Sequence, residues 1–273
     1  MSEREAFLAA IIRRPDDDVP RLIFADYLDE RGESARAELI RLQCAAARGE
    51  PVPSGRIAEL CAQHQAEWLA PLGRGVYHAE FRRGFPEHVV ISARDFLRDG
   101  DLIRAQTPLR SVALLNAGRV LARLLTQNHL KGLAALHLTG GMLGDAGVER
   151  LVECPHLAGL TTLRLGYNEI SDDGAAAIAA SPTMANLRVL VLSHNAIGDA
   201  GVWELARSPI LGRLRALDLS ANEISPSALA ILQNSPWLDQ LVELSADDQR
   251  PTVRWRIPAL FAPKPDEPIL SRE

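Results

Sequence analysis

The 273-residue sequence has no apolar run of the roughly 20 residues that a helix needs to cross a bilayer. Its three cysteines, Cys44, Cys61 and Cys154, are odd in number and widely spaced, which indicates neither a disulfide framework nor a zinc site. A glycine-rich phosphate loop, a G-x-S-x-G nucleophile motif and an H-E-x-x-H zinc motif are also missing. These absences disfavour a membrane-spanning protein, a disulfide-rich secreted domain and the enzyme classes that those motifs mark.

The charge balance limits the classes of partner. Charged residues make up 24% of the sequence and the formal net charge is -5 at pH 7, so no overall positive field would attract nucleic acid. The N-terminal stretch MSEREAFLAAIIRRPDDD becomes acidic where a signal peptide would carry its cleavage site. We therefore expect a cytoplasmic protein that binds neither nucleic acid nor a membrane.

A 27-residue repeat runs through the second half of the sequence. Its first leucine recurs at Leu133, Leu160, Leu187, Leu214 and Leu241, and its second at Leu136, Leu163, Leu190, Leu217 and Leu244. The same register holds Asn168, Asn195 and Asn222, the aspartates Asp145, Asp172 and Asp199, and the pairs Cys154-Pro155, Ser181-Pro182, Ser208-Pro209 and Ser235-Pro236. So many positions in one register make chance an unsatisfactory explanation, and the unit must correspond to a structural repeat.

Each unit has the pattern of one short strand followed by one helix. In LTTLRLGYN, residues 160–168, leucines alternate with other residues, which predicts a strand with one buried face. The following aspartate predicts an N-cap for the helix of its own unit, because a carboxylate accepts hydrogen bonds from free backbone N–H groups. Proline then ends the helix. One such unit cannot bury its own apolar face, so the units must stack, with the asparagines bonding neighbouring turns in a ladder.

The N-terminal part predicts helices in place of repeats. Ser2 and Glu5 form a capping-box pattern that opens a first helix ending near Pro15. Three more helices are expected over 16–32, 34–49 and 54–69, and Gly32 is the expected stop of the second. The charged stretch DYLDERGESARAE between the second and third helices indicates a solvated face with ion pairs, with a docking surface as the alternative.

Two family resemblances follow from these motifs. Residues 109–246 resemble a leucine-rich repeat array, and the long unit resembles the ribonuclease-inhibitor-like subclass. Residues 7–43 resemble a repeat-companion domain of bacteria, which precedes such repeats. That second resemblance is carried by Ala25-Asp26-Tyr27-Leu28, Glu30-Arg31-Gly32 and Arg36-Ala37-Glu38-Leu39-Ile40-Arg41.

The resemblances imply an α/β fold: a leucine-rich-repeat solenoid with a parallel inner sheet and outer helices, preceded by a small all-α module. We expect the helical module at 1–72, a junction and N-terminal cap at 73–108, repeats at 109–246, and a C-terminal cap and tail at 247–273. Within the junction, a first capping strand at 86–91 and a helix at 93–104 are expected, and the repeats should add six strands.

The candidate site is the inner face of the arc, where a repeat protein usually binds its partner. Counted from the first leucine, positions 3, 5 and 7 of each unit should point inward, with position 8 near the rim. The candidate partner-binding residues are His137, Arg164, Tyr167, Val191, His194, Asp218 and Glu243. Because Arg164, Val191 and Asp218 are one repeat apart, they should lie side by side, and Tyr167 should stack on His194.

Other chemistry is weakly supported. The histidines have no metal-ligand partner at helical spacing, the repeat aspartates are better explained as helix caps than as a calcium row, and Cys154 occupies a slot for a small structural residue. We therefore expect no metal, no cofactor and no catalytic residue. The sequence favours a monomeric, non-catalytic scaffold or adaptor that binds another protein. The alternative is a regulator of a partner enzyme, of the inhibitory or GTPase-activating type, and a stand-alone enzyme comes third.

Overall fold

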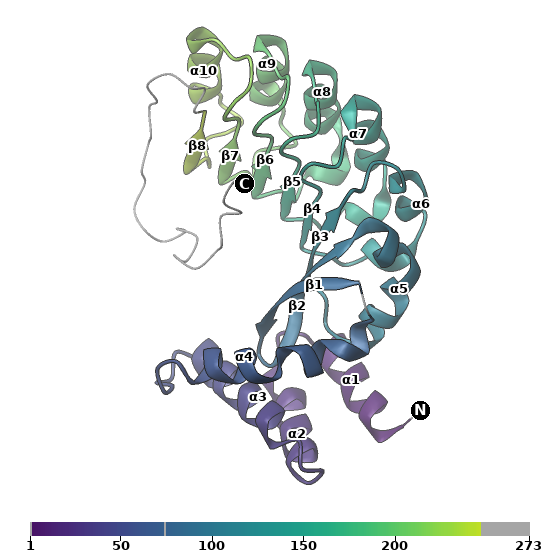
Figure 1. Cartoon of the computed structure of the whole chain (residues 1–273). Coiled ribbons are helices and arrows are strands. Elements are labelled where there is room, and N and C mark those ends of the chain that lie inside the picture. Colours follow the sequence, from purple (N-terminus) through teal and green to yellow (C-terminus); the bar gives the residue numbers. More distant parts are fainter. Residues whose placement is uncertain (1, 74, 247–273) are drawn as a thin grey trace.

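The computed structural model describes residues 2–73 and 75–246, and within them the strands form one eight-stranded sheet in the order β1 to β8 (Figure 1). β1 is antiparallel to β2, and the strands from β2 to β8 are parallel. The sheet lines the inner side of an arc, helices α5 to α10 cover its outer side, and helices α1 to α4 precede it (Figure 1). This is the α/β repeat architecture that the sequence predicted.

The elements are short, particularly in the repeats. The strands are β1 (Val76–Arg82), β2 (Phe85–Ser92), β3 (Ser111–Leu115), β4 (Ala135–His137), β5 (Thr162–Arg164), β6 (Val189–Val191), β7 (Ala216–Asp218) and β8 (Glu243–Ser245). The α-helices are α1 (Glu3–Arg13), α2 (Asp18–Asp29), α3 (Ser34–Ala47), α4 (Arg56–Leu69), α5 (Ala93–Gln106), α6 (Leu121–Leu125), α7 (Gly144–Val152), α8 (Asp172–Ala180), α9 (Asp199–Arg207) and α10 (Pro226–Gln233). Short 3-10 turns lie at Ala70–Leu72, Asn128–Leu130, Pro155–Leu157 and Pro182–Met184.

The leucines of the strands form the core of the arc. Leu136, Leu163, Leu190 and Leu217 lie opposite one another on β4 to β7 and are at most 1% exposed. Because successive residues of a strand point to opposite faces, the residues on either side of each leucine are left on the inner surface.

The predicted asparagine ladder is confirmed. Asn195 Oδ1 accepts hydrogen bonds from the backbone N–H groups of Asn168 (2.9 Å) and Ile170 (3.1 Å), and its Nδ2 donates to the carbonyls of Leu165 and Leu192. Asn168 and Asn222 make equivalent bonds one repeat to either side. The ladder satisfies backbone groups where the chain turns out of the sheet, groups that would be costly to bury unpaired.

The repeat aspartates do not cap their own helices, so that expectation was wrong. Asp172 is the first residue of α8, and its Oδ1 accepts from the backbone N–H groups of Gly198 (2.7 Å) and Gly201 (2.8 Å) at the start of α9. Asp145 and Asp199 bond in the same way to the starts of α8 and α10. Neighbouring helices stack closely enough for a first-turn side chain to reach the free N–H groups of the next helix.

The small residue before each repeat proline forms a hydrogen bond with the C-terminal end of the helix in the previous repeat. Ser181 Oγ donates to the Val152 carbonyl (2.7 Å), and Ser208 Oγ donates to the Ala179 carbonyl (2.5 Å). Cys154 Sγ donates in the equivalent place, to the Leu125 carbonyl at 3.4 Å. Ser235 Oγ donates to the Ala206 carbonyl of α9 in the same way. The ends of α6 to α9 are thus each stabilised by the following repeat, which agrees with a structural role for Cys154.

Substituting Asp172 tests the capping between repeats. We expect Asp172→Ala to lower the free energy of unfolding by about 0.5–2 kcal/mol, because the N–H groups of Gly198 and Gly201 lose their acceptor. The neighbouring Asp173 is exposed and provides the matched control, so Asp173→Ala should change stability by less than about 0.5 kcal/mol. Urea denaturation measures both, and equal effects of the two substitutions would contradict the capping role.

The N-terminal helices form close to the predicted positions. Ser2 and Glu5 make the expected capping box at the start of α1. Between α2 and α3, Arg41 pairs with Asp26 (2.7 Å) and Asp29 (2.6 Å), which are the ion pairs expected of the charged stretch. These pairs are largely exposed, so each contributes little to stability.

The junction contains a strand that the sequence analysis did not predict. β1 pairs antiparallel with β2 in a hairpin that turns at Arg83 and Gly84, both with positive φ. β1 was missed because most of its side chains are half-buried or exposed, so VYHAEFR lacks apolar alternation. Gly84 approaches α3 so closely that a Cβ would lie 2.1 Å from Ile40 Cγ1. The sheet therefore has β1 in addition to the strand predicted at 86–91, which is β2, and the six predicted repeat strands.

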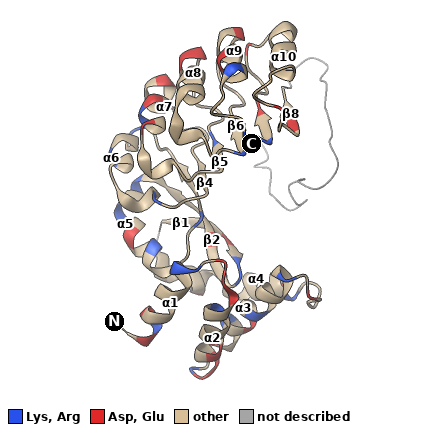
Figure 2. Cartoon of the chain, turned by 180° about the vertical axis from the view of Figure 1, so that it is seen from behind, with Lys and Arg blue, Asp and Glu red and all other residues tan. Residues whose placement is uncertain are grey.

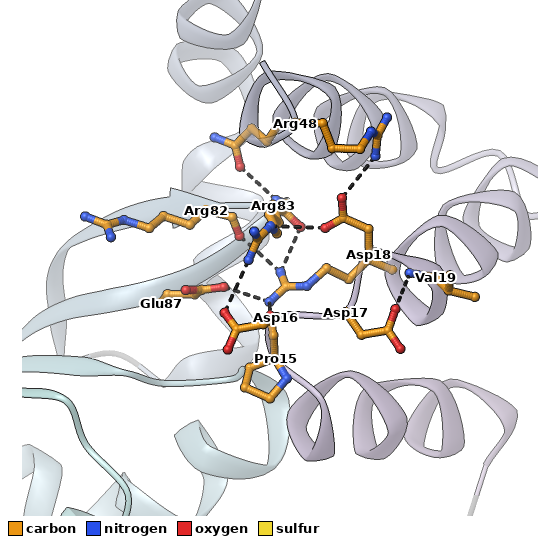
Figure 3. Close-up of polar contacts among 12 residues, drawn as sticks. Pro15, Asp16, Asp17, Asp18, Val19, Arg48, Arg82, Arg83 and Glu87 are labelled. Carbon is orange, nitrogen blue, oxygen red and sulfur yellow. Dashed lines mark hydrogen bonds and ion pairs between the residues drawn. The ribbon is translucent and has the colours of Figure 1, made fainter. Parts of the chain in front are cut away.

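A buried arginine joins the N-terminal helices to this hairpin. Arg21 of α2 is fully buried, and its Nη2 donates to Glu87 Oε1 on β2 (2.7 Å) and to the Pro15 carbonyl (2.6 Å) (Figure 3). Its Nη1 donates to the carbonyls of Arg82 and Arg83 at the hairpin turn. Burial raises the pKa of Glu87 and lowers the pKa of Arg21, because each charge loses hydration, while the attraction between them opposes both shifts.

The acidic run at the start of α2 adds ion pairs around this contact, and Figure 3 shows those of Asp16 and Asp18 with Arg83 and Arg48. Asp16 pairs with Arg110 just before β3 (2.6 Å), and Asp18 pairs with Arg83 (3.1 Å) and Arg48 (3.0 Å). The hydrogen bond from Arg110 is the main reason that the pKa of Asp16 is lowered. The helices therefore contact both the hairpin and the first repeat.

The expected C-terminal cap and tail at 247–273 lie outside the described residues. Within 2–73 and 75–246, no helix is long and apolar enough to cross a membrane.

Candidate protein-binding face

The register of the sheet places four of the candidate residues in one row. His137, Arg164, Val191 and Asp218 are direct partners on β4, β5, β6 and β7, as the repeat spacing predicted. All four are partly exposed on the face opposite the buried leucines. Glu243, on β8, pairs with Ala216 and so lies in the neighbouring row, away from Asp218. The inner face thus carries a continuous row that runs from an imidazole through a guanidinium to a carboxylate.

Tyr167 and His194 form the predicted stack at the rim. Their ring centroids are 4.0 Å apart and the ring planes differ by 11°. Both residues follow a strand at the corner of the turn and take positive φ values, 58° and 55°. Gly140 and Ala221, at the same position of the neighbouring repeats, also have positive φ, so this conformation belongs to the repeat turn. The Tyr167 side chain remains 54% exposed, so the pair presents an aromatic surface to solvent.

His137 is part of a polar cluster that extends toward the N-terminal end of the sheet. Its ring centroid is 5.3 Å from that of His88 on β2, and His88 Nδ1 lies 2.7 Å from Ser111 Oγ on β3. Burial, then Arg164 and His88, lower the pKa of His137 to about 3. His137 is therefore a neutral hydrogen-bonding group at ordinary pH, and the positive charge of this part of the row comes from Arg164.

His88 and Ser111 were not among the residues predicted for the site. Ser111 occupies position 3 of the imperfect unit that begins at Leu109, so counting from that leucine was an available signal. His88 offered a weaker signal, because only the pairing of β2 with β3 places it beside Ser111. That pairing spans 23 residues instead of the 27 between equivalent positions of the later repeats.

Asp218 is partly held by its own turn. Its Oδ1 accepts a hydrogen bond from the backbone N–H of Ser220 at 3.0 Å, which fixes the orientation of the carboxylate. Val191, between Arg164 and Asp218, supplies an apolar surface in the row. Adjacent strands thus carry a fixed acid, an apolar side chain and a guanidinium. Together these groups can form ion pairs, hydrogen bonds and apolar contacts with a protein partner.

The described residues offer little else for chemistry. No group of three or more His, Cys, Asp or Glu side chains in 2–73 and 75–246 is arranged to hold a metal ion. A pocket on the outer side of the arc, between α9 and α10, is lined mainly by apolar groups that include Ala206, Ile231 and Trp237. It contains no residue of the inner row.

The comparisons with known proteins agree with the repeat architecture. The leucine-rich repeat family model matches residues 158–179 and 183–206, which include most of α8 and most of α9. No curated protein matches the chain. Among solved structures, the chain is similar to an internalin from Listeria monocytogenes str. 4b F2365, with 20% identity over 54% of this chain and a TM-score of 0.31.

The chain spans 44% of the length of that internalin. Leucine-rich repeat domains generally bind proteins, using the extended concave surface that stacked repeats create. The chain therefore contains leucine-rich repeats at 158–179 and 183–206, and these lie within the strand–helix turns stacked from β3 to β8.

Proposed function

We propose that this protein is a non-catalytic, cytoplasmic scaffold or adaptor that binds a protein partner on the inner face of the arc. The proposed contact residues are His137, Arg164, Tyr167, Val191, His194, Asp218 and Glu243. The observation that carries the proposal is the exposed Tyr167–His194 stack beside the row that contains Arg164 and Asp218.

The energetics of binding favour this surface over the rest of the chain. Arginine and tyrosine are the residue types most often found as energetic anchors of interfaces. The row lies on strands held by parallel pairing and by the asparagine ladder, so little conformational entropy would be lost on binding. The neutral His137 can donate or accept a hydrogen bond without the cost of desolvating a charge.

The organisation of the chain is part of the proposal. We assign 1–72 to a helical module related to the bacterial repeat-companion domain, 73–108 to a junction and N-terminal cap, 109–246 to repeats of the ribonuclease-inhibitor-like subclass, and 247–273 to a C-terminal cap and tail. The buried Arg21–Glu87 pair supports a module that is fixed to the arc and that serves to present it. The protein is proposed to act as a monomer.

A double substitution tests the inner face. Arg164→Ala with Tyr167→Ala should leave the melting temperature nearly unchanged, because Arg164 lies on the face opposite the leucine core and Tyr167 is exposed at the rim. Partner capture from the native host should weaken by about tenfold or more, since anchors of this kind often contribute over 1.4 kcal/mol each. Affinity capture followed by quantitative mass spectrometry measures the loss.

The matched control lies on the outer face. Arg207 stacks over the exposed Trp203 ring at 4.4 Å on α9, so Trp203→Ala with Arg207→Ala removes the same types of group elsewhere. Equal capture by wild type and by the Arg164/Tyr167 variant would move the binding site off the inner face. Once a partner is purified, a change in its turnover on binding would favour the regulator of an enzyme over the scaffold.

A further inference from the structure

The carboxyl ends of the strands form a rim with its own exposed groups. Met142 is 76% exposed and Tyr167 is 54% exposed, and His194, Glu169 and Glu223 are also exposed. Met142, Glu169 and Glu223 occupy the same position in their repeats, two residues beyond the position shared by Tyr167 and His194. We call these five residues the rim patch.

The rim patch is rigid because the turns that carry it are bonded to one another. The backbone N–H of Tyr167 donates to the Ser193 carbonyl (3.1 Å), and that of His194 donates to the Ser220 carbonyl (2.8 Å). The N–H of Glu223 donates to the Ile197 carbonyl (2.9 Å). Side chains held on such turns lose little freedom when a partner binds.

The charges of the arc are divided between its two edges. At the rim, residues 139–146, 166–173, 193–200 and 220–227 contain no lysine or arginine, and their acids are Asp145, Glu169, Asp172, Asp173, Asp199 and Glu223. The opposite edge, at the beginnings of the strands, is mainly basic: it carries Lys131, Arg188, Arg213 and Arg215, together with one acid, Asp239. Figure 2 shows the acidic residues in red over the beginnings of α7, α8 and α9.

Three of the rim acids are already used inside the fold. Asp145, Asp172 and Asp199 accept the backbone hydrogen bonds that cap the next helix, so they contribute less to an outside ligand. Glu169 and Glu223 lie outside this ladder and are exposed on either side of His194 along the rim. Together with the aromatic pair they define a surface that is both acidic and aromatic.

We propose that the rim patch binds an arginine-bearing segment of the protein partner, with an apolar side chain next to the arginine. This inference rests on the proposed protein-binding function and adds the chemistry of the partner. A guanidinium stacks on an aromatic face and also forms paired hydrogen bonds with a carboxylate, so one arginine can engage Tyr167 and Glu169 together. Met142 supplies the adaptable apolar contact for the neighbouring side chain.

The different charges of the two edges determine which kind of partner segment the rim selects. An acidic segment would meet carboxylates on rim turns that hold no lysine or arginine, whereas a basic segment is attracted to those turns and repelled by the mainly basic opposite edge. The partner segment should therefore lie along the rim, across the turns that follow β4 to β7, and not along the edge with Arg188 and Arg215.

Selection of a random dodecapeptide library displayed on phage against the full chain tests the proposal. We expect enriched peptides with arginine beside an aliphatic or aromatic residue. Synthetic copies of these peptides should bind at least about tenfold more weakly to Tyr167→Ala and to the double variant Glu169→Lys with Glu223→Lys, as measured by fluorescence anisotropy. Raising the salt concentration should weaken binding to the wild type.

The matched control is Glu149→Lys with Glu204→Lys, which makes the same change of net charge at exposed positions of α7 and α9. Its affinity should stay within about twofold of the wild type, a free-energy difference of roughly 0.4 kcal/mol. Equal losses in both charge-reversal variants, enrichment of acidic peptides, or no enrichment at all would each overturn the proposal.

The outcomes separate this inference from the proposed function. If host partners are lost in the Arg164/Tyr167 variant while display selects acidic peptides, the inner face binds protein but the rim patch does not select arginine. If arginine peptides bind the rim patch while host partners are unaffected by the Arg164/Tyr167 substitutions, the proposed function fails in its choice of surface.

Discussion

Replacing Glu87 by glutamine is expected to lower the free energy of unfolding by about 3–5 kcal/mol, the largest effect among these predictions. The substitution keeps the shape of the side chain but leaves the buried guanidinium of Arg21 without its opposite charge. Burial already disfavours the charged forms of both residues, as the directions of their pKa shifts show. The intact pair therefore contributes only modestly to the free energy of unfolding. The large loss arises when one charge is removed and the other stays buried.

An exposed pair of the same type provides the control. Glu38 accepts two hydrogen bonds from Arg56, each 2.7 Å long, but the side chains are 41% and 37% exposed. Glu38→Gln should therefore cost less than about 1 kcal/mol, because water and salt screen the lost charge. Guanidinium chloride denaturation followed by circular dichroism compares the two variants. Similar costs for Glu87→Gln and Glu38→Gln would show that the buried pair does not fix the helices to the hairpin.

Removing a leucine from the centre of the arc is the second large effect. Leu190→Ala should destabilise the protein by about 2–5 kcal/mol, because Leu190 is fully buried between Leu163 and Leu217. The loss combines the transfer free energy of the deleted atoms with the cost of the cavity that remains. Stacked repeats hold the surrounding backbone in place, so the cavity can close only partly.

Val191 is the matched control for Leu190. It is the next residue of β6, but it lies on the inner face and is partly exposed. Val191→Ala should cost no more than about 1 kcal/mol, which is the range of strand preferences at such positions. Urea midpoints measure both variants. A midpoint for Leu190→Ala equal to that of the wild type would contradict the register of the sheet.

The spacing of the repeat was sufficient to predict which residues share a row. A strand has a period of two, and the unit repeats every 27 residues, so the leucines at 163, 190 and 217 must share the buried face while Arg164, Val191 and Asp218 share the other. The same reasoning predicted the Tyr167–His194 stack and the asparagine ladder. These features depend only on local geometry and a constant offset.

Contacts that depend on the distance between elements could not be predicted in this way. Asp172 was expected to cap its own helix, and only the packing of α8 against α9 decides that its carboxylate reaches Gly198 and Gly201. His88 meets His137 because the first parallel pairings span fewer residues than the later ones. An irregular offset leaves no periodic signal in the sequence.

The sequence by itself determined the repeat, its alternation of strand and helix, and the residues left on the inner face, because those follow from periodicity and from burial of leucine. The tertiary structure alone decided that Arg21 of α2 is buried against Glu87 of β2 and that β1 pairs with β2 in a hairpin. Two charges 66 residues apart carry no mark of their partnership in the sequence. They pair only when folding removes both charges from water, because the attraction of each then offsets part of the hydration that the other has lost.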